Sequence, residues 1–150
     1  MTDRGTSRRR PRPASPGLLA RRIALLALFE DEFRPGEAST ALARMAGERD
    51  LPDDIRTHAS TIVEGVARHR VELDARIATE APLIPVAELG RIERAILRSA
   101  IYEVLYSAAT PSGETMRDAV SLARIYAGDA ARRLVNGVLG SVSRSSGGGT

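Results

Sequence analysis

The sequence contains no cysteine, no tryptophan and no lysine, and it has only two histidines. Without cysteine the chain can form neither a disulfide nor a thiolate metal site, and it has no cysteine nucleophile. His58 and His69 lack the i,i+4 spacing of a helical metal pair, so we expect no metal site. No apolar run approaches the ~18 residues that a membrane-spanning helix needs. These absences predict a soluble, cytoplasmic protein that does not insert into a membrane.

Sequence patterns that signal catalysis are also missing. There is no phosphate-binding Walker loop, no dinucleotide-binding glycine pattern and no G-x-S-x-G nucleophile motif. Glu93 and Glu103 would stand roughly 15 Å apart along one helix, too far to act as a carboxylate pair on one bond. We therefore expect no catalytic residues, no cofactor and no enzymatic activity.

Positive charge is concentrated at the N-terminus. Residues 1–22 hold seven arginines and one aspartate, a net charge of +6, whereas the whole chain carries +3. The remaining residues therefore sum to −3. A basic arm on a slightly acidic body is a pattern of nucleic-acid-binding chains, but a basic tail that only aids solubility fits equally well. Arg8, Arg9 and Arg10 are the candidate phosphate contacts in this arm.

The rest of the chain shows helical periodicity without a convincing strand. The pattern predicts an all-α fold of about seven helices in a single domain over residues 18–143. It is flanked by a flexible Arg/Pro-rich arm, residues 1–17, and a flexible Gly/Ser tail, residues 144–150. The first helix, 18–33, places Leu18, Leu25, Leu26, Phe29 and Phe33 on one broad face. The other expected helices are 37–46, one that starts at an Asp53 N-cap, one over "VELDARIATE", 87–107, 114–127 and one from 130 to about 142.

Two acidic residues interrupt the apolar face of the central helix. In "GRIERAILRSAIYEVL", residues 90–105, Arg91, Arg94 and Arg98 group on one side, which the pattern predicts to be solvated. Glu93 and Glu103 instead project within the apolar arc, at 100° per residue. Each needs either a buried partner or a binding partner outside the chain.

The segment "RRLVNGVLGSV", residues 132–142, holds a second anomaly. Gly137 in a helix interior costs about 1 kcal/mol relative to alanine. Close packing of another helix is the expected reason. Asn136, the only asparagine, is expected to be structural, with its amide bonded to a loop or a helix end.

Several segments together resemble the NusB family of bacterial transcription antitermination factors. They are "ARRIALLALFE" (20–30), "VEGVARHRVELD" (63–74), "LGRIERAILRSAIYEVLY" (89–106), "DAVSLAR" (118–124) and "RLVNGVLG" (133–140). The resemblance implies two packed helical subdomains and binding of boxA RNA in ribosomal RNA leader transcripts together with the ribosomal protein NusE. With other Nus factors, such a complex helps RNA polymerase to read through terminators.

The resemblance also implies roles for individual residues. It places RNA contacts in the arm and the first helix, including Arg21, Arg22 and Phe29, which stands where the family usually has tyrosine. Spacing alone favours a core position for Phe29, with a base-stacking role as the alternative. Glu93 matches an acidic residue of the surface that faces RNA and partner. Glu103 matches a position that suggests a buried hydrogen-bond acceptor.

Other functions remain open at this level. One is a protein-only interaction module, for example a homodimer formed through an apolar helical surface. Another is the NusB-like accessory domain of enzymes that modify ribosomal RNA. The chain also departs from the family pattern: "PRPASPGLL" separates the arm arginines from the first helix, and Leu134 stands where the last helix usually has phenylalanine.

Overall fold

The computed structural model describes residues 15–107 and 111–147, which form seven α-helices and one 3₁₀ turn and contain no strand. The helices are α1 Pro16–Phe33, α2 Ala38–Glu48, α3 Asp53–Arg68, α4 Arg70–Glu80, α5 Arg91–Tyr106, α6 Ser112–Ala127 and α7 Asp129–Gly147, and the turn η2 spans Val86–Glu88. The predicted all-α class is confirmed. No helix in the described ranges is both long and apolar enough to cross a membrane.

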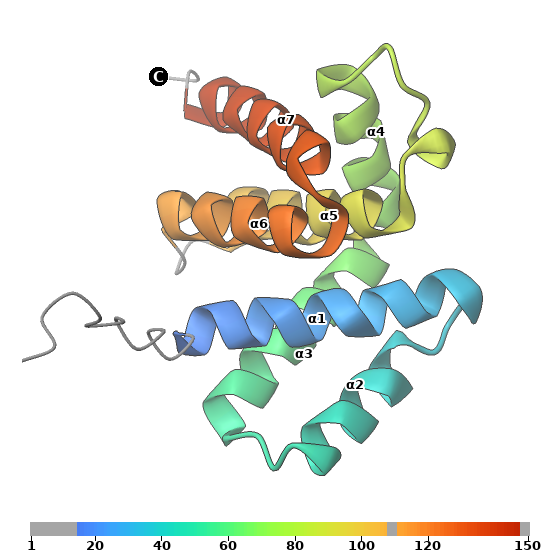
Figure 1. Ribbon diagram of the computed structural model, residues 1–150, viewed down its shortest axis with the longest axis vertical. Coiled ribbons are helices and arrows are strands. Elements are labelled where there is room, and N and C mark those ends of the chain that lie inside the picture. The colour runs from blue at the N-terminus through green and yellow to red at the C-terminus, as the bar shows by residue number, and fades with distance from the viewer. Residues whose placement is uncertain (1–14, 108–110, 148–150) are drawn as a thin grey trace, which may run out of the picture.

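The helices form two packed groups (Figure 1). Helices α1, α2 and α3 lie together below the layer of α5 and α6, and α4 and α7 lie above that layer in this view. Contacts of α1 and α3 with α5 join the two groups. This arrangement agrees with the two helical subdomains that the resemblance implied.

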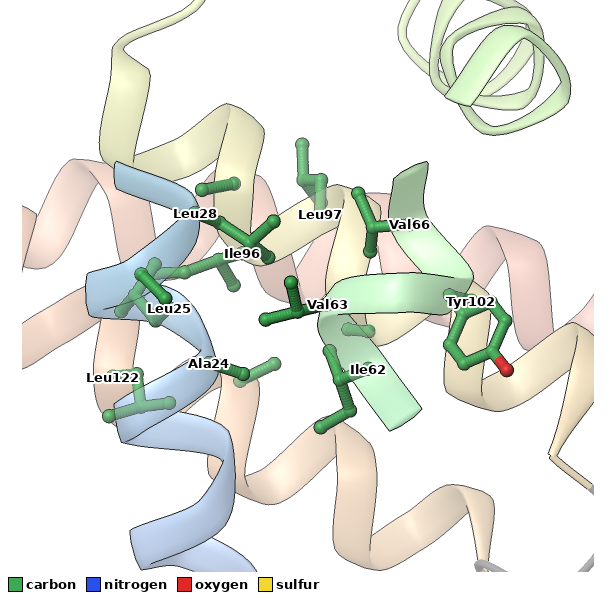
Figure 2. Packing of buried hydrophobic residues seen from close by; sticks show 14 of the residues in the cluster. Ala24, Leu25, Leu28, Ile62, Val63, Val66, Ile96, Leu97, Tyr102 and Leu122 are labelled. Carbon is green, nitrogen blue, oxygen red and sulfur yellow. The ribbon is translucent and has the colours of Figure 1, made fainter. Parts of the chain in front are cut away.

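The core lies where α1, α3 and α5 meet. Ala24 of α1 lies beside Ile62 of α3, and Leu25 of α1 lies with Ile96 of α5 and Leu122 of α6 (Figure 2). Burying an aliphatic side chain of this size contributes roughly 1.5–3 kcal/mol relative to leaving it in water. The three-helix junction is therefore the main source of the energy that holds the two groups together.

The buried side of α1 differs from the predicted one. The helix buries an alanine-rich arc, Ala20, Ile23, Ala24, Ala27 and Leu28, together with Leu25. Of the other residues on the predicted apolar face, Leu18, Leu26 and Phe29 are only partly buried, and Phe33 is 54% exposed. Small alanines let α3 and α5 approach the backbone closely, so the bulkier residues are left on the outer side. Phe33 therefore lies exposed on the outer side of α1, next to the half-buried Leu26 and Phe29.

Several helix ends also differ from the prediction. Pro52, with an extended ψ of 151°, occupies the N-cap position of α3, so Asp53 is the first helical residue and not the cap. Gly90, with a ψ of 147°, separates the turn η2 from α5, which therefore begins at Arg91 and not near residue 87. Helix α7 continues to Gly147, past the predicted end near Val142.

The explanation given for Gly137 is wrong. A Cβ atom added to Gly137 would have no atom within 4 Å, and the residue is exposed on α7. Asn136 is exposed as well, and its amide has no hydrogen bond within the described ranges. Close packing of two helices occurs instead at Gly65 on α3, where a Cβ would lie 2.0 Å from the ring of Tyr102 on α5.

Candidate nucleic-acid interface

The outer face of α1 carries a basic and aromatic stripe. Arg22, Leu26, Phe29 and Phe33 follow one another at i, i+4, i+7 and i+11, so they lie on one side of the helix. Arg22 and Phe33 are exposed, and Leu26 and Phe29 are half-buried. We call these four residues the α1 face. It contains two of the predicted RNA contacts, Arg22 and Phe29.

At its C-terminal end the α1 face continues onto the start of α5. The rings of Phe29 and Phe33 meet edge to face, with centroids 5.1 Å apart. The guanidinium carbon of Arg91 lies 4.5 Å from the centroid of the Phe33 ring. This distance allows a cation–π contact, which holds an exposed positive charge beside the two aromatic rings.

Glu93 lies two residues beyond Arg91, in the first turn of α5. Its carboxylate folds back over Gly90, since a Cβ there would lie 2.6 Å from Glu93 Oε1. Gly90 has no side chain with which to cap the helix, and a carboxylate near the free N–H groups of a helix start is favourable. Glu93 therefore stabilises the start of α5 and remains half-buried at the surface.

At its N-terminal end the α1 face meets the end of α6. Arg22 Nε donates a hydrogen bond of 2.8 Å to the hydroxyl of Tyr126. Tyr126 is half-buried and lies one residue before the end of α6. The side chain of Arg22 is thus tied to a second helix.

The predicted RNA contact through Arg21 does not fit this structure. Arg21 is only 5% exposed. Its Nε and Nη2 donate to the two oxygens of Glu103, at 2.9 and 3.2 Å, and its Nη1 donates to Asp118 Oδ2 at 2.7 Å. Since its guanidinium is enclosed and paired, Arg21 can anchor α1 but cannot reach a phosphate.

Glu103 has the buried acceptor role that the resemblance implied. It is 2% exposed and also lies 3.1 Å from Nε2 of His58 on α3. Burial alone raises the pKa of the Glu103 carboxyl, but hydrogen bonds from His58 and Arg21 outweigh burial, and the pKa is below its ordinary value. The carboxylate therefore stays ionised and joins α1, α3 and α5.

A second ion network joins the other end of α1 to the rest of the molecule. Glu32 accepts from Nε and Nη2 of Arg94 at 2.8 and 2.9 Å, and from Nη1 of Arg98 at 3.2 Å. Arg98 also donates to both oxygens of Asp74 on α4, at 2.7 and 2.9 Å. The hydrogen bond from Arg94 is the largest cause of the lowered pKa of Glu32. The two networks hold α1 and α5 in an antiparallel register.

The structure brings some predicted site residues together and separates others. Arg22 and Phe29 share the α1 face, and Glu93 lies on the helix start that borders it. Arg8, Arg9 and Arg10 lie outside the described residues, so their RNA contacts stay a prediction. Asn136 and Gly137 lie on α7, in the other group of helices.

Three residues of this interface were missed by the sequence prediction. Phe33 continues the Arg22–Phe29 spacing along α1, but the sequence prediction named it only as part of an apolar face and not as an RNA contact. Arg91 and Tyr126 had no such signal, because they reach the α1 face through contacts between helices that are distant in sequence.

The chain is similar to known proteins over most of its length. Residues 18–144 match the model of the NusB family. It is 32% identical over 126 residues to the transcription antitermination protein NusB of Dehalococcoides mccartyi, covering 84% of this chain and 88% of that protein. It is 35% identical over 133 residues to the NusB of Symbiobacterium thermophilum, covering 83% of this chain and 87% of that protein.

Solved structures give the same result. A crystal structure of antitermination factors NusB and NusE in complex with dsRNA matches with a TM-score of 0.79 and 26% identity, over 87% of this chain and 97% of that chain. A structure of T. maritima NusB matches with a TM-score of 0.81 and 24% identity, over 88% and 93% of the two chains. The latter likeness concerns the fold alone.

Proposed function

This chain belongs to the NusB family, and we propose that it acts as a transcription antitermination factor that binds boxA RNA together with the ribosomal protein NusE. In this proposal it joins RNA polymerase and other Nus factors in the cytoplasm and promotes read-through of terminators. In this proposal the arm before α1 adds charge to the helical binding domain formed by α1 to α7.

The observation that carries this proposal is the composition of the α1 face and its borders. Single-stranded RNA is bound by aromatic rings that stack on bases and by cations that contact phosphates. Phe29 and Phe33 supply the rings, and Arg22 and Arg91 supply guanidinium groups at either end. Glu93 adds an acceptor for a base edge or for a donor of the protein partner.

A binding role, rather than a catalytic one, fits the ionisable groups of the interior. Arg21, Glu103 and Asp118 are buried and bonded to one another, so they are occupied by structural contacts. The proposal is also supported by the similar NusB that was crystallised with NusE and dsRNA.

The test is a fluorescence anisotropy titration of labelled boxA RNA and of a scrambled RNA with the full chain, with and without NusE. We expect boxA to bind more tightly than the scrambled RNA, with a further gain from NusE. Equal binding of the two RNAs in both conditions would refute the proposal.

Matched variants locate the interface. Arg22→Ala should weaken boxA binding, whereas Arg144→Ala, an exposed arginine on α7, should not. Self-association of the chain that depends on Phe33, without any RNA binding, would favour the homodimer function instead.

A further inference from the structure

Arg22 is held in a defined position although it is exposed. Within the described ranges its guanidinium makes one hydrogen bond, from Nε to Tyr126, and none from Nη1 or Nη2. The hydroxyl of Tyr126 therefore fixes the Arg22 side chain through Nε and leaves Nη1 and Nη2 available. These nitrogens form the part of a guanidinium that can bind a phosphate in bidentate fashion.

The backbone of Arg22 is fixed separately by its neighbour. Arg21 is bonded to Glu103 on α5 and to Thr115 and Asp118 on α6. The packing around it is tight, because a Cβ on Gly17 would lie 2.6 Å from Glu114 Oε1 and 2.9 Å from Arg21 Nη1. The first turns of α1 therefore have little freedom to shift along α5 and α6.

We propose that Tyr126 and Arg21 are positioning residues for an RNA phosphate contact made by Arg22. Tyr126 orients the guanidinium, and the buried cluster around Arg21 holds the helix turn that carries it. This inference rests on the proposed function, and it assigns a role to two residues that do not themselves touch RNA.

Preorganisation explains why such a device would raise affinity. A free arginine side chain loses rotamer freedom when it binds, and this loss weakens the complex. A side chain that is already ordered in the unbound protein loses less. The contribution of Arg22 to RNA binding should then depend on the hydroxyl of Tyr126.

The decisive experiment is a double-mutant cycle on boxA binding with Arg22→Ala and Tyr126→Phe, measured over a range of salt concentrations. In the parent, Arg22→Ala should reduce the log–log salt slope by about 0.7, the value for one phosphate contact on single-stranded RNA. In the Tyr126→Phe background the same change should reduce the affinity by clearly less, because the unordered side chain of Arg22 contributes less to binding. Tyr106→Phe is the matched control, because it removes the same atom from another partly exposed tyrosine.

Tyr126→Phe keeps the aromatic ring and should keep the melting temperature, so loss of the fold does not confuse the result. If Arg22→Ala has the same effect in both backgrounds while the parent binds boxA, Tyr126 is not a positioning residue. If the parent does not bind RNA at all, the proposed function itself fails. The Nε–H signal of Arg22 in NMR, slowed in exchange in the parent and not in Tyr126→Phe, tests the geometry without RNA.

Arg21 is tested by Arg21→Lys, which keeps a positive charge beside the carboxylates but lacks the fork that bonds them together. Arg98→Lys is the control, because Arg98 is a buried arginine of α5 that bonds to Glu32 near the C-terminal end of α1. Both variants should lower the melting temperature. Only Arg21→Lys should reduce the contribution of Arg22 to boxA affinity, measured as the effect of Arg22→Ala in each background, and an equal contribution in both variants would overturn the role of Arg21.

Discussion

Glu93 and Glu103 are the same residue type on the same helix, and their surroundings give them different roles. Glu103 is enclosed by donors from α1 and α3, and Glu93 lies over the backbone at the start of α5. The sequence showed both as anomalies of an apolar face, but only the tertiary structure separates a buried acceptor from a surface acid.

The lowered pKa of Glu103 makes the stability of the fold depend on pH. Because the folded-state pKa lies below the ordinary value of 4.5, its ionised form stabilises the fold above that pH. This stabilisation is lost as the pH falls through the folded-state pKa. Glu103→Gln should therefore cost roughly 1.5–3 kcal/mol at neutral pH, the range for a hydrogen bond to a charged group.

The difference in the free energy of unfolding between the parent and Glu103→Gln should then narrow as the pH falls below 4.5 and through the lowered folded-state pKa of Glu103. Chemical unfolding at a series of pH values measures this difference. A difference that stays constant down to the acid unfolding of both proteins would contradict the assignment.

Phe29 should contribute more to binding than to stability. Phe29→Ala removes a ring that can stack on a base, a loss of roughly 1–3 kcal/mol per base. Because the ring is half-buried, the variant should lose less stability than the roughly 3–5 kcal/mol of a fully buried phenylalanine. Parallel boxA titration and thermal unfolding measure both. A large loss of stability with unchanged RNA affinity would make Phe29 a core residue.

At the scale of elements, α1 shows how much of the fold can be predicted. Its periodicity predicted the helix and its length to within two residues, because helix formation is a local property. Its buried side was not predicted, because, of the five large apolar residues that share one broad face, only Leu25 is fully buried. Close packing on α3 and α5 instead selected the arc of alanines, and that preference depends on neighbours that the local sequence does not specify.

The two ion networks at the ends of α1 have opposite polarity. Near its start α1 supplies the cation, Arg21, to acids of α5 and α6. Near its end α1 supplies the anion, Glu32, to arginines of α5. Placing α1 in the reverse direction on α5 would bring like charges together, so the networks specify one direction as well as one register.

Two glycines in helix interiors should respond in opposite ways to alanine. Gly137→Ala should raise the free energy of unfolding by roughly 0.5–1 kcal/mol, because α7 gains helix propensity and the added Cβ meets no atom. Gly65→Ala should lower it by roughly 1–3 kcal/mol, because the Cβ would overlap the ring of Tyr102. Urea unfolding of both variants measures these two changes in the free energy of unfolding. Equal changes of the same sign would contradict the packing described.

At the scale of the whole molecule, the fold class and the family were predictable and the interface was predictable only in part. Segments such as "RAILRSAIYEVLY" and "RLVNGVLG" carry the family pattern in their order along the chain. The interface combines Arg22, Arg91 and Tyr126 from three helices, and no local pattern reports their proximity. The same limit explains why Arg21 was taken for an RNA contact: adjacent arginines on a helix point to different sides.

The arginines that precede α1 should add affinity without sequence selectivity. Deleting residues 1–14 retains Ser15, whose side chain accepts a 3.1 Å hydrogen bond from Leu18 N and caps α1. Each lost phosphate contact should flatten the log–log salt slope by about 0.7 for single-stranded RNA. Binding of boxA and of scrambled RNA at several salt concentrations checks this. An unchanged slope would remove the arm from the RNA-binding function.

The most direct test of the account is to map where RNA lies on the folded chain. BoxA RNA containing 4-thiouridine is cross-linked by light to the full chain in the presence of NusE, and the modified peptides are identified by mass spectrometry. We expect cross-links in α1 and at the start of α5, around Phe29, Phe33 and Arg91. Cross-links confined to α4 and α7, with α1 unmodified, would contradict the claim that the α1 face binds RNA.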